Sequence, residues 1–508
     1  MDISKHFSQN QLDHNLSQPL YLQILDIITR KITDHTLPPS SKLPPERELA
    51  NLFGVSRTTA INAYRQLEQQ GLIQTKIGSG TYVADLPIKL TNATPPIPWN
   101  QLFTPYPKSP VSSILRELVA TPISEHNISL AAGMPDPALY PFGIFTDLFQ
   151  KHSHNIDQAD LGYISTEGYT PLRQTLAAMH NQKDTTPASI DNILILSGAQ
   201  QGIYLISKIF LQPGDCVIVE SPTYIGAIQV FQNAGVRILT LPSITPLPLA
   251  ILEDYLIRYR PKLFYIIPTY QNPNGRVLPL NERLELLRLA AQHQLIIVED
   301  DPYSELYYHE PPPLSLKALD HHNCVIYLGT FSKTVFPGLR TGWMVAPPPV
   351  INRIALEKQY VDLHSNNLSQ WLINLFLKEG ALQPHLTQVR KEYKKRRDIA
   401  AGSLRRYCGS QLDFSLPSGG FYLWCKLQTE VTSQVLLLEA TKNGVSFVPG
   451  EAFYTEQSDF KELRLCFATH SEEKLQEGIK RLAKALSSLN QKQEHRVIEK
   501  DCSTRPII

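Results

Sequence analysis

A proline-rich stretch near residue 100 divides this sequence into two parts with different patterns. Seven prolines fall between Pro87 and Pro110, in a segment with two lysines, no carboxylate and no periodicity of 2 or 3.6 residues. Proline fixes φ and lacks a backbone donor, so the segment favours an extended linker over a helix or strand. The alternative is a long irregular loop inside one domain, but such loops are uncommon in compact domains. The sequence therefore predicts two domains joined by a linker over 86–124.

Length and composition agree with two soluble domains. Single cores stop growing near ~250–300 residues, and this chain has 508. A hydrophobic content of 42% with 19% charged residues excludes a disordered or fibrous chain. Six scattered cysteines without a CxxC pair, and no long apolar run, predict a reduced cytoplasmic protein without a metal site or membrane span. The 48 basic and 47 acidic residues leave a net charge of +1, which points to no class of partner.

The first 85 residues carry the signals of three short helices and a β-hairpin. Apolar spacing predicts a helix over 21–32, and a second helix stops at Gly54. Ser56 is a natural N-cap for a third helix that ends at Gly71. One side of this third helix is expected to carry Ile61, Tyr64, Leu67 and Glu68. Two β-rich segments follow, joined by a glycine-rich tip at 78–80.

Helices and hairpin in this order are typical of a winged helix-turn-helix. The recognition helix of that motif places its N-terminal residues in the DNA major groove. The corresponding residues are Ser56, Arg57, Thr58 and Thr59, with Arg47 able to reach a phosphate. Residues 1–85 hold eight basic and eight acidic side chains, so a positive face must come from their arrangement. DNA binding is the favoured hypothesis, and a small protein-interaction bundle is the alternative.

The segment LPPERELANLFGVSRTTAINAYRQLEQQGLIQTKIGSGTYVA resembles the winged-helix domain of GntR-family bacterial transcription regulators. The match is continuous over residues 17–85. The resemblance implies a DNA-binding domain over 1–85 that recognises a double-stranded operator. The implied contact residues are Arg47, Arg57, Thr58, Thr59, Gly78, Ser79 and Gly80.

After the linker, helical patterns alternate with short apolar strands. The expected strands are 192–196, 216–220, 263–267, 295–299, 324–328 and 341–345. This alternation predicts an α/β domain over 125–489 with a mostly parallel sheet. The polar residues from Asn490 predict a frayed C-terminal tail over 490–508.

Polar residues after two of these strands fit a pyridoxal-phosphate site. An aldehyde cofactor held as a Schiff base needs a lysine, and Lys333 follows an apolar strand, with Thr330, Ser332 and Arg340 suited to a phosphate. Asp300 ends another strand, where open α/β sheets bind ligands and a carboxylate can keep a pyridine nitrogen protonated. A solvated surface lysine and a solvated strand end are the ordinary alternatives.

Further polar residues also lie after strands. The turn at 197–202 opens a helix whose backbone N–H groups can bind an anion. Tyr224 can stack on a ring or be a core tyrosine, and Asn272 can bind a phenolic oxygen or make a plain turn. Arg464 lies on an otherwise apolar strand, so it needs a partner, either an amino-acid carboxylate or a structural salt bridge.

In this order the pieces look like the aspartate-aminotransferase family, fold type I of the pyridoxal-phosphate enzymes, over about residues 125–485. The resemblance implies an α/β domain with a smaller α+β subdomain, Lys333 in an internal aldimine and Asp300 at the pyridine nitrogen. Arg464 would take a substrate carboxylate, and Tyr163 would reach the phosphate of the neighbouring subunit in a homodimer. The other implied cofactor contacts are Ala199, Gln200, Tyr224, Asn272, Tyr303, Thr330, Ser332 and Arg340.

A GntR-type winged helix linked to an aminotransferase-like domain is similar to the MocR subfamily of bacterial regulators. The resemblance implies a dimeric, cytoplasmic transcription regulator that binds pyridoxal phosphate, DNA and an amine or amino-acid effector. Because no catalytic group is missing, an active aminotransferase with a DNA-binding appendage is the alternative. A scaffold that has lost both ligands conflicts with so many intact polar site residues.

Overall fold

The computed structural model divides the chain into two compact units. It describes residues 12–13, 18–76, 79–84, 102, 127–183, 188–456 and 460–503. The units are 1–104 and 105–508, so the division falls inside the predicted linker, which itself lies outside the described residues except for Leu102. The domain boundaries drawn from the sequence therefore stay predictions. Each unit is described by itself below.

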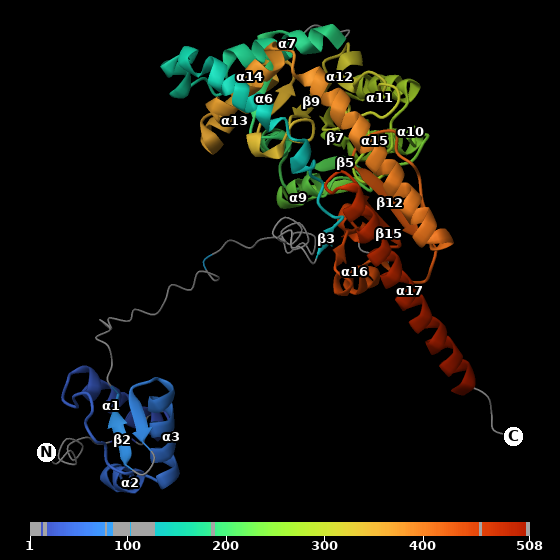
Figure 1. Cartoon of the computed structure of the whole chain (residues 1–508). Helices are drawn as coiled ribbons and strands as arrows, with labels where there is room; N and C mark the ends of the chain where they lie inside the picture. Colours follow the sequence, from blue (N-terminus) through green and yellow to red (C-terminus); the bar gives the residue numbers. More distant parts are fainter. Residues whose placement is uncertain are drawn as a thin grey trace. The chain divides into compact units, whose positions relative to one another are not determined.

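The described residues between 18 and 84 form three helices and a two-stranded hairpin, as the sequence predicts (Figure 1). The elements are α1 (Leu20–Thr33), α2 (Glu46–Phe53), α3 (Arg57–Gln69), β1 (Ile73–Lys76) and β2 (Gly80–Val83). Gly54 ends α2 in the left-handed region with φ 66°, a conformation that costs glycine little. Ser56 caps α3, because its side chain accepts a hydrogen bond from the Thr59 backbone N–H at 3.2 Å.

The buried face of α3 includes residues that the apolar pattern did not single out. Tyr64 and Leu67 are buried, and two alanines, Ala60 and Ala63, complete the face. Ile61 is half-buried and Glu68 is exposed, so the side predicted to carry these four residues is buried only in part. Small side chains let α3 pack closely, with the Tyr64 hydroxyl donating to the Pro44 carbonyl at 2.6 Å.

The C-terminal unit is built on a seven-stranded sheet with the order β4-β10-β9-β8-β7-β5-β6. Its strands are β4 (Ile193–Leu196), β5 (Cys216–Ser221), β6 (Arg237–Pro242), β7 (Leu263–Ile266), β8 (Ile296–Asp301), β9 (Val325–Thr330) and β10 (Gly342–Val345). Only β10 runs antiparallel to its neighbours, which confirms the mostly parallel sheet. The edge strand β6 was not predicted.

Helices cover the sheet, and a smaller subdomain follows it. The first set is α6 (Phe142–His152), α7 (Thr170–Lys183), α8 (Ala199–Phe210), α9 (Ile225–Asn233), α10 (Leu249–Tyr259), α11 (Leu280–His293), α12 (Leu316–Leu319), α13 (Pro348–Asp362) and α14 (Asn367–Lys378). The long helix α15 (Leu382–Tyr407) leads from this set to the subdomain (Figure 1).

The subdomain is a four-stranded sheet with two helices. Its order is β11-β12-β15-β14, from β11 (Leu412–Phe414), β12 (Tyr422–Leu427), β14 (Val448–Pro449) and β15 (Glu462–Cys466). Helices α16 (Ser433–Lys442) and α17 (Glu472–Ser503) pack beside it, and the short strand β13 (Val445–Ser446) pairs with β3 (Ile128–Ser129). This confirms the smaller α+β subdomain that the resemblance implies.

The last helix continues beyond the predicted start of the tail. Helix α17 runs through Asn490 to Ser503, so a frayed segment from 490 was the wrong expectation for these residues. A helix begun by a packed apolar face can extend over polar residues of good helix propensity such as Gln, Lys and Glu. Among the described residues, no helix combines the length and the apolar character that a membrane crossing needs.

Two glycines of the α15 region give a matched test of the backbone. Neither Gly402 inside the helix nor Gly409 just after it has an atom within 4 Å of a built Cβ, but Gly409 has φ +56°. We expect Gly402→Ala to stabilise the larger unit by about 1 kcal/mol and Gly409→Ala to destabilise it by about 1 kcal/mol. Thermal unfolding of the full chain followed by circular dichroism measures both. The reverse order of melting temperatures would contradict the helix end drawn here.

Candidate functional site

The predicted polar residues meet around the carboxyl ends of three adjacent parallel strands. Strands β7, β8 and β9 are neighbours, and Asn272, Asp300 and Lys333 lie at or just beyond their ends. Ligands bind at this edge of open α/β sheets because the loops leave a crevice there. The strand order thus brings together residues that are far apart in the sequence.

Lys333 lies in the turn after β9 and points into the protein. Its Nζ donates a hydrogen bond to the carbonyl of Gly133 at 2.7 Å. Burial lowers the pKa of Lys333 to about 8, and the positive charges of Arg464 and Arg340 contribute to the decrease. A lysine with this pKa is partly deprotonated near neutrality, as an amine nucleophile must be.

Asp300 is buried at the end of β8 and is only half satisfied. One carboxylate oxygen accepts a hydrogen bond from the Tyr265 hydroxyl at 2.6 Å, and the other, Oδ1, has no partner. Burial raises the pKa of Asp300 to about 7, although the Tyr265 bond and the Lys333 charge act in the opposite direction. An orphaned buried carboxylate oxygen is costly, so this atom fits a donor from a bound group, such as a protonated pyridine nitrogen.

Arg340 lies against the start of α8, where an anion site was predicted. Gly198 precedes the helix with φ 101°, and the Arg340 Nη2 donates to the Ser197 carbonyl at 2.6 Å. A Cβ built on Gly198 would lie 2.7 Å from Arg340 Nη2, so glycine is what lets the guanidinium lie against this helix end. Ala199 and Gln200 are the first residues of the helix, where free N–H groups favour a phosphate.

The hydroxyls predicted for the phosphate lie in the turn that carries Lys333. The Thr330 Oγ1 and Ser332 Oγ are 3.1 Å apart, and the Ser332 backbone N–H also donates to Thr330 at 3.1 Å. Both side chains are thereby held at the end of β9. They suit a dianion as hydroxyl donors without adding charge.

Arg464 is buried on β15 without a carboxylate partner among the described residues. Its two terminal nitrogens donate to the Asn272 side-chain oxygen and the Ala131 carbonyl, both at 2.9 Å, while Nε has no partner. Its guanidinium also lies over the ring of Tyr422, 4.1 Å from the centroid. The structural salt bridge, one of the two alternatives for this residue, is absent from the part of the chain described. A ligand carboxylate suits it.

The aromatic residues of the site are linked to this arginine. The Tyr303 hydroxyl lies 2.9 Å from that of Tyr422, on whose ring Arg464 rests. Tyr224 lies at the start of α9, where burial raises the pKa of its hydroxyl and the charge of Asp300 raises it further. Its ring packs against Gly226, where a Cβ would come within 2.6 Å. Both predicted tyrosines therefore lie among the predicted polar groups.

Four contributors to the site were not predicted. Two are backbone carbonyls, Ala131 and Gly133, which bind Arg464 and Lys333. The others are Tyr265 and Tyr422. Tyr265 could have been predicted, because a tyrosine hydroxyl on a buried strand needs a hydrogen-bond partner and the neighbouring strand β8 supplies Asp300. Carbonyls carry no such signal in a sequence.

Tyr163 stands apart from these residues. Its side chain is 87% exposed and meets His364 edge-on, with 5.7 Å between ring centroids. An exposed position suits the predicted contact of Tyr163 with a neighbouring subunit.

Most predicted DNA contacts lie at the surface of the N-terminal unit. Arg47, Ser56, Arg57 and Thr58 are exposed, and Arg57 makes a surface ion pair with Glu46 at 3.3 Å. Thr59 is half-buried, and its hydroxyl lies 2.8 Å from that of Ser56 within the helix cap.

At the hairpin tip, the Ser79 hydroxyl lies 2.8 Å from the Tyr82 hydroxyl, and Gly80 has φ +120°. A Cβ on Gly80 would come 2.8 Å from Lys42 Cε. Gly78 lies outside the described residues.

Comparison with known families identifies both units. The aminotransferase class I and II model matches residues 128–482, and the model of bacterial regulatory proteins of the gntR family matches residues 20–83. The uncharacterized HTH-type transcriptional regulator YisV of Bacillus subtilis is 34% identical, over 95% of this chain and 99% of its own length. The whole two-part organisation is thus shared with that relative.

Relatives of the larger unit alone are aminotransferases. The 2-aminoadipate transaminase of Thermus thermophilus is 35% identical over 78% of this chain and 98% of its own length. The structure of LysN, the α-aminoadipate aminotransferase of the same species, in complex with N-(5'-phosphopyridoxyl)-L-leucine, has a TM-score of 0.71 and 34% identity. It covers 77% of this chain and 99% of that one. Its ligand contains a phosphopyridoxyl group, which agrees with pyridoxal phosphate as the cofactor of the family.

The two matches and the full-length relatives agree with each other and with the geometry of both units. The chain belongs to the aminotransferase class I and II family and, with its gntR-type N-terminal domain, to the MocR subfamily of GntR-family regulators.

Proposed function

We propose that this protein is a DNA-binding transcription regulator whose larger domain holds pyridoxal phosphate on Lys333 and senses the cofactor, an amine or an amino acid. The observation that carries the proposal is the half-satisfied Asp300, buried near a lysine with a lowered pKa, in a chain with a gntR-type domain. When bound, the cofactor supplies an aldehyde that bonds to an amine and a pyridine ring that accepts electrons. We also propose the domain boundaries predicted from the sequence.

Each part of the cofactor has a matching group in the site. Asp300 Oδ1 would accept a hydrogen bond from the pyridinium N–H, and Tyr224 would stack on the ring. The start of α8 with Arg340, Thr330 and Ser332 would hold the phosphate.

Asn272 and Tyr303 would lie toward the phenolic oxygen of the cofactor, on the side where its aldehyde reacts. Lys333 would supply the amine: a pKa of about 8 in place of 10.5 increases its deprotonated fraction roughly 300-fold at neutral pH.

Arg464 defines the kind of effector that fits. It is buried, has an Nε without a partner, and is held by neutral oxygens instead of a carboxylate. A carboxylate from an amino acid would complete its hydrogen bonds and neutralise its charge. An effector with an amine near Lys333 and a carboxylate on Arg464 can shift the domain between two states only by binding one of them more tightly.

A homodimer is part of the proposal. Exposed apolar residues lie near Tyr163 in the chain and along the end of α13 and beyond, namely Leu161, Leu356, Tyr360, Val361, Leu363 and Leu368. A second copy of the chain would cover them and place Tyr163 at the partner's phosphate site. Sedimentation of the loaded protein as a monomer at micromolar concentration would argue against this arrangement.

An aminotransferase activity is the second candidate. It is favoured by the completeness of the site and by the 36% identity to aromatic-amino-acid aminotransferase 1 of Thermococcus litoralis over 74% of the chain. Steady-state transfer of an amino group from an amino acid to a keto acid, abolished in Lys333→Ala, would establish it. A regulator without turnover would bind the amino acid but release no keto acid.

Removing the lysine tests the cofactor site directly. We expect Lys333→Ala to lose the visible absorbance band and the borohydride-trapped adduct that pyridoxal phosphate gives with the native chain, because the substitution removes the amine that bonds to the aldehyde. Lys208→Ala, on the outer part of α8, serves as the control and should keep both. A persistent trapped adduct in Lys333→Ala would overturn the assignment. If the native protein bound the operator equally well with and without pyridoxal phosphate, the proposed coupling between cofactor binding and DNA binding would be overturned.

The charge of Asp300 should be visible in the titration of Lys333. Burial lowers the pKa of Lys333 to about 8, and the negative charge of Asp300 opposes this decrease. In the cofactor-free protein, modification of Lys333 by trinitrobenzenesulfonate should therefore rise with a midpoint near pH 8, and Asp300→Asn should move the midpoint lower. Peptide mass spectrometry reads the modified lysine. The exposed Asp413→Asn should leave the midpoint unchanged, and an upward shift in Asp300→Asn would contradict the geometry.

Arg57 should carry much of the operator affinity. Its surface ion pair with Glu46 is worth little, so the guanidinium is available to a base or phosphate. We expect Arg57→Ala to weaken operator binding by about 10- to 100-fold at fixed salt. Arg30→Ala, exposed in the last turn of α1, is the control and should change affinity little. Fluorescence anisotropy with a promoter fragment measures both. Equal losses for the two variants would refute a specific role.

With eight basic and eight acidic residues in 1–85, we also expect a shallow salt dependence of operator binding. A titration of the operator complex with salt measures it. A slope equivalent to ten or more phosphate contacts would count against this expectation.

A further inference from the structure

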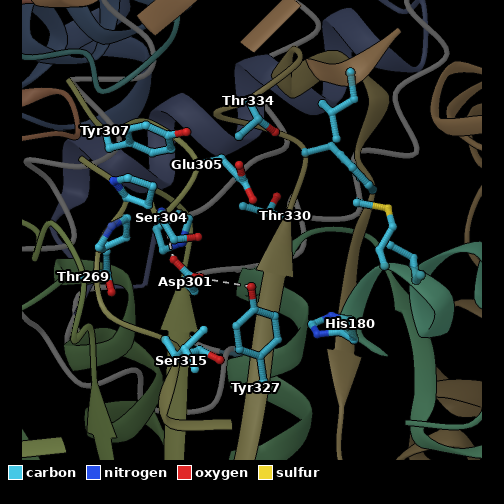
Figure 2. A pocket seen from close by; sticks show the side chains of 18 of the residues that line it. His180, Thr269, Asp301, Ser304, Glu305, Tyr307, Ser315, Tyr327, Thr330 and Thr334 are labelled. Carbon is cyan, nitrogen blue, oxygen red and sulfur yellow. Dashed lines mark hydrogen bonds between the residues drawn. The ribbon is translucent and has the colours of Figure 1, made fainter. Parts of the chain in front are cut away.

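A cavity lies next to the predicted cofactor site, on the side of strand β8 that Asp301 occupies. Successive residues of a strand point to opposite faces, so Asp301 faces away from Asp300. Asp301 lines a cavity of about 550 Å³ together with Thr330 and Tyr327 of β9 (Figure 2). This volume is in the range of small-molecule sites. Lys333, Asp300 and Arg464 are not among its lining residues, and Thr330 is the residue that it shares with the predicted phosphate contacts.

The cavity contains more negative than positive charge. Asp301 is buried and accepts hydrogen bonds from the Ser304 backbone N–H and the Tyr327 hydroxyl, each at 3.0 Å. Glu305 is the second carboxylate and pairs with Arg390 of α15 at 2.9 Å. The lining therefore contains two carboxylates, those of Asp301 and Glu305, and one guanidinium, that of Arg390. Figure 2 shows Asp301, Glu305 and Tyr327 with their polar ends in the same pocket.

His180 also lines the cavity and is hydrogen-bonded to a neighbouring wall residue. The indole N–H of Trp343 donates to the Nε2 atom of His180 at 3.0 Å. This ring nitrogen therefore acts as an acceptor. Burial raises the pKa of Asp301, and the negative charge of Glu305 adds to the increase despite the Ser304 and Tyr327 bonds. A positively charged occupant would stabilise both carboxylates.

The other walls combine apolar residues with neutral polar side chains, among them Gln182, Ser315 and Thr334. Three consecutive prolines, Pro311 to Pro313, line one part of the cavity and offer carbonyl oxygens but no N–H group. Phe331 and Trp343 contribute aromatic rings, and the guanidinium of Arg390 already occupies the face of Tyr307 at 3.8 Å from the centroid. Carboxylates, carbonyls and aromatic faces all attract cations. Few groups here would favour an anion, because Arg390 is already paired.

We propose that this cavity is a second binding site, for a small organic cation: an ammonium group attached to a flat apolar body. The charged group would lie near Asp301 and Glu305, and the apolar body would lie against Phe331, Trp343 and the prolines. The site is separate from Lys333, so the inference stands whether or not the proposed function is correct.

A probe that cannot react with an aldehyde separates the two sites. Benzyltrimethylammonium has a ring and a permanent charge but no N–H, so it cannot bond covalently to the cofactor. Isothermal titration of the full chain should show about one equivalent bound per chain, and Lys333→Ala should bind it equally well. Asp301→Asn, which keeps the size of the side chain, and Glu305→Gln should each weaken binding by at least about tenfold. The exposed Asp413→Asn is the matched control and should bind like the native chain.

Related molecules test the charge requirement. Benzyl alcohol, which keeps the ring without the charge, should bind at least about tenfold more weakly, and phenylacetate should not compete. The proposal is overturned if the probe fails to bind at millimolar concentration, if Asp301→Asn and Glu305→Gln bind as well as the native chain, or if phenylacetate binds equally well. Loss of binding in Lys333→Ala alone would also overturn it, because the probe would then occupy the cofactor site. Glu305→Gln keeps the test valid should Asp301→Asn fail to fold.

Discussion

Three consecutive buried carboxylates at the end of β8 organise the larger domain. Each must be satisfied in a different way, because strand alternation points neighbours to opposite faces. Glu299 accepts two backbone N–H groups at the start of α12, each at 2.8 Å, and burial raises its pKa to about 7. Asp301, on the same face as Glu299, is held by Ser304 and Tyr327. Asp300 alone keeps an open oxygen, on the face where Lys333 and the start of α8 meet. One strand end therefore fixes a helix, a cavity wall and the candidate cofactor site.

Much of this arrangement could be predicted from the sequence, because a charged residue on an otherwise apolar strand indicates a binding site or an ion pair. A strand that ends in carboxylates, and an arginine on an apolar strand, both need partners, and parallel strands bring their ends to one edge. The family resemblance implied Asp300 at the pyridine nitrogen. In the structure Asp300 binds Tyr265 of the neighbouring β7 and keeps one oxygen without a partner, whereas Asp301 binds both Tyr327 of β9 and the Ser304 backbone N–H.

What escaped prediction has physical causes of two kinds. Backbone carbonyls bind the two key cations, yet Gly133 is 200 residues from Lys333 in the chain, and no side-chain pattern marks a carbonyl. Apolar sequence patterns also predict strands and helix faces poorly where the residues are only partly buried. The edge strand β6 is buried at only two of its six positions, and α3 packs partly through two alanines that no apolar pattern marks. Long-range contacts and edge packing are set by the fold as a whole.

The buried polar atoms of the site that lack hydrogen-bond partners link ligand binding to the stability of the domain. Asp300 Oδ1 and Arg464 Nε are both buried without partners, and each unsatisfied buried group costs about 1–3 kcal/mol. A cofactor that donates to Asp300, and a carboxylate that accepts from Arg464, would remove these costs in the bound state only. Binding of this kind stabilises the folded domain by about 2.7 kcal/mol at 100 times the Kd. Because Arg464 lies on the subdomain strand β15 while Asn272 and Ala131 belong to other segments, a ligand there acts where the subdomain meets the sheet. A domain completed only by its ligand would have the property that a sensor requires, because its preferred state would depend on what is bound.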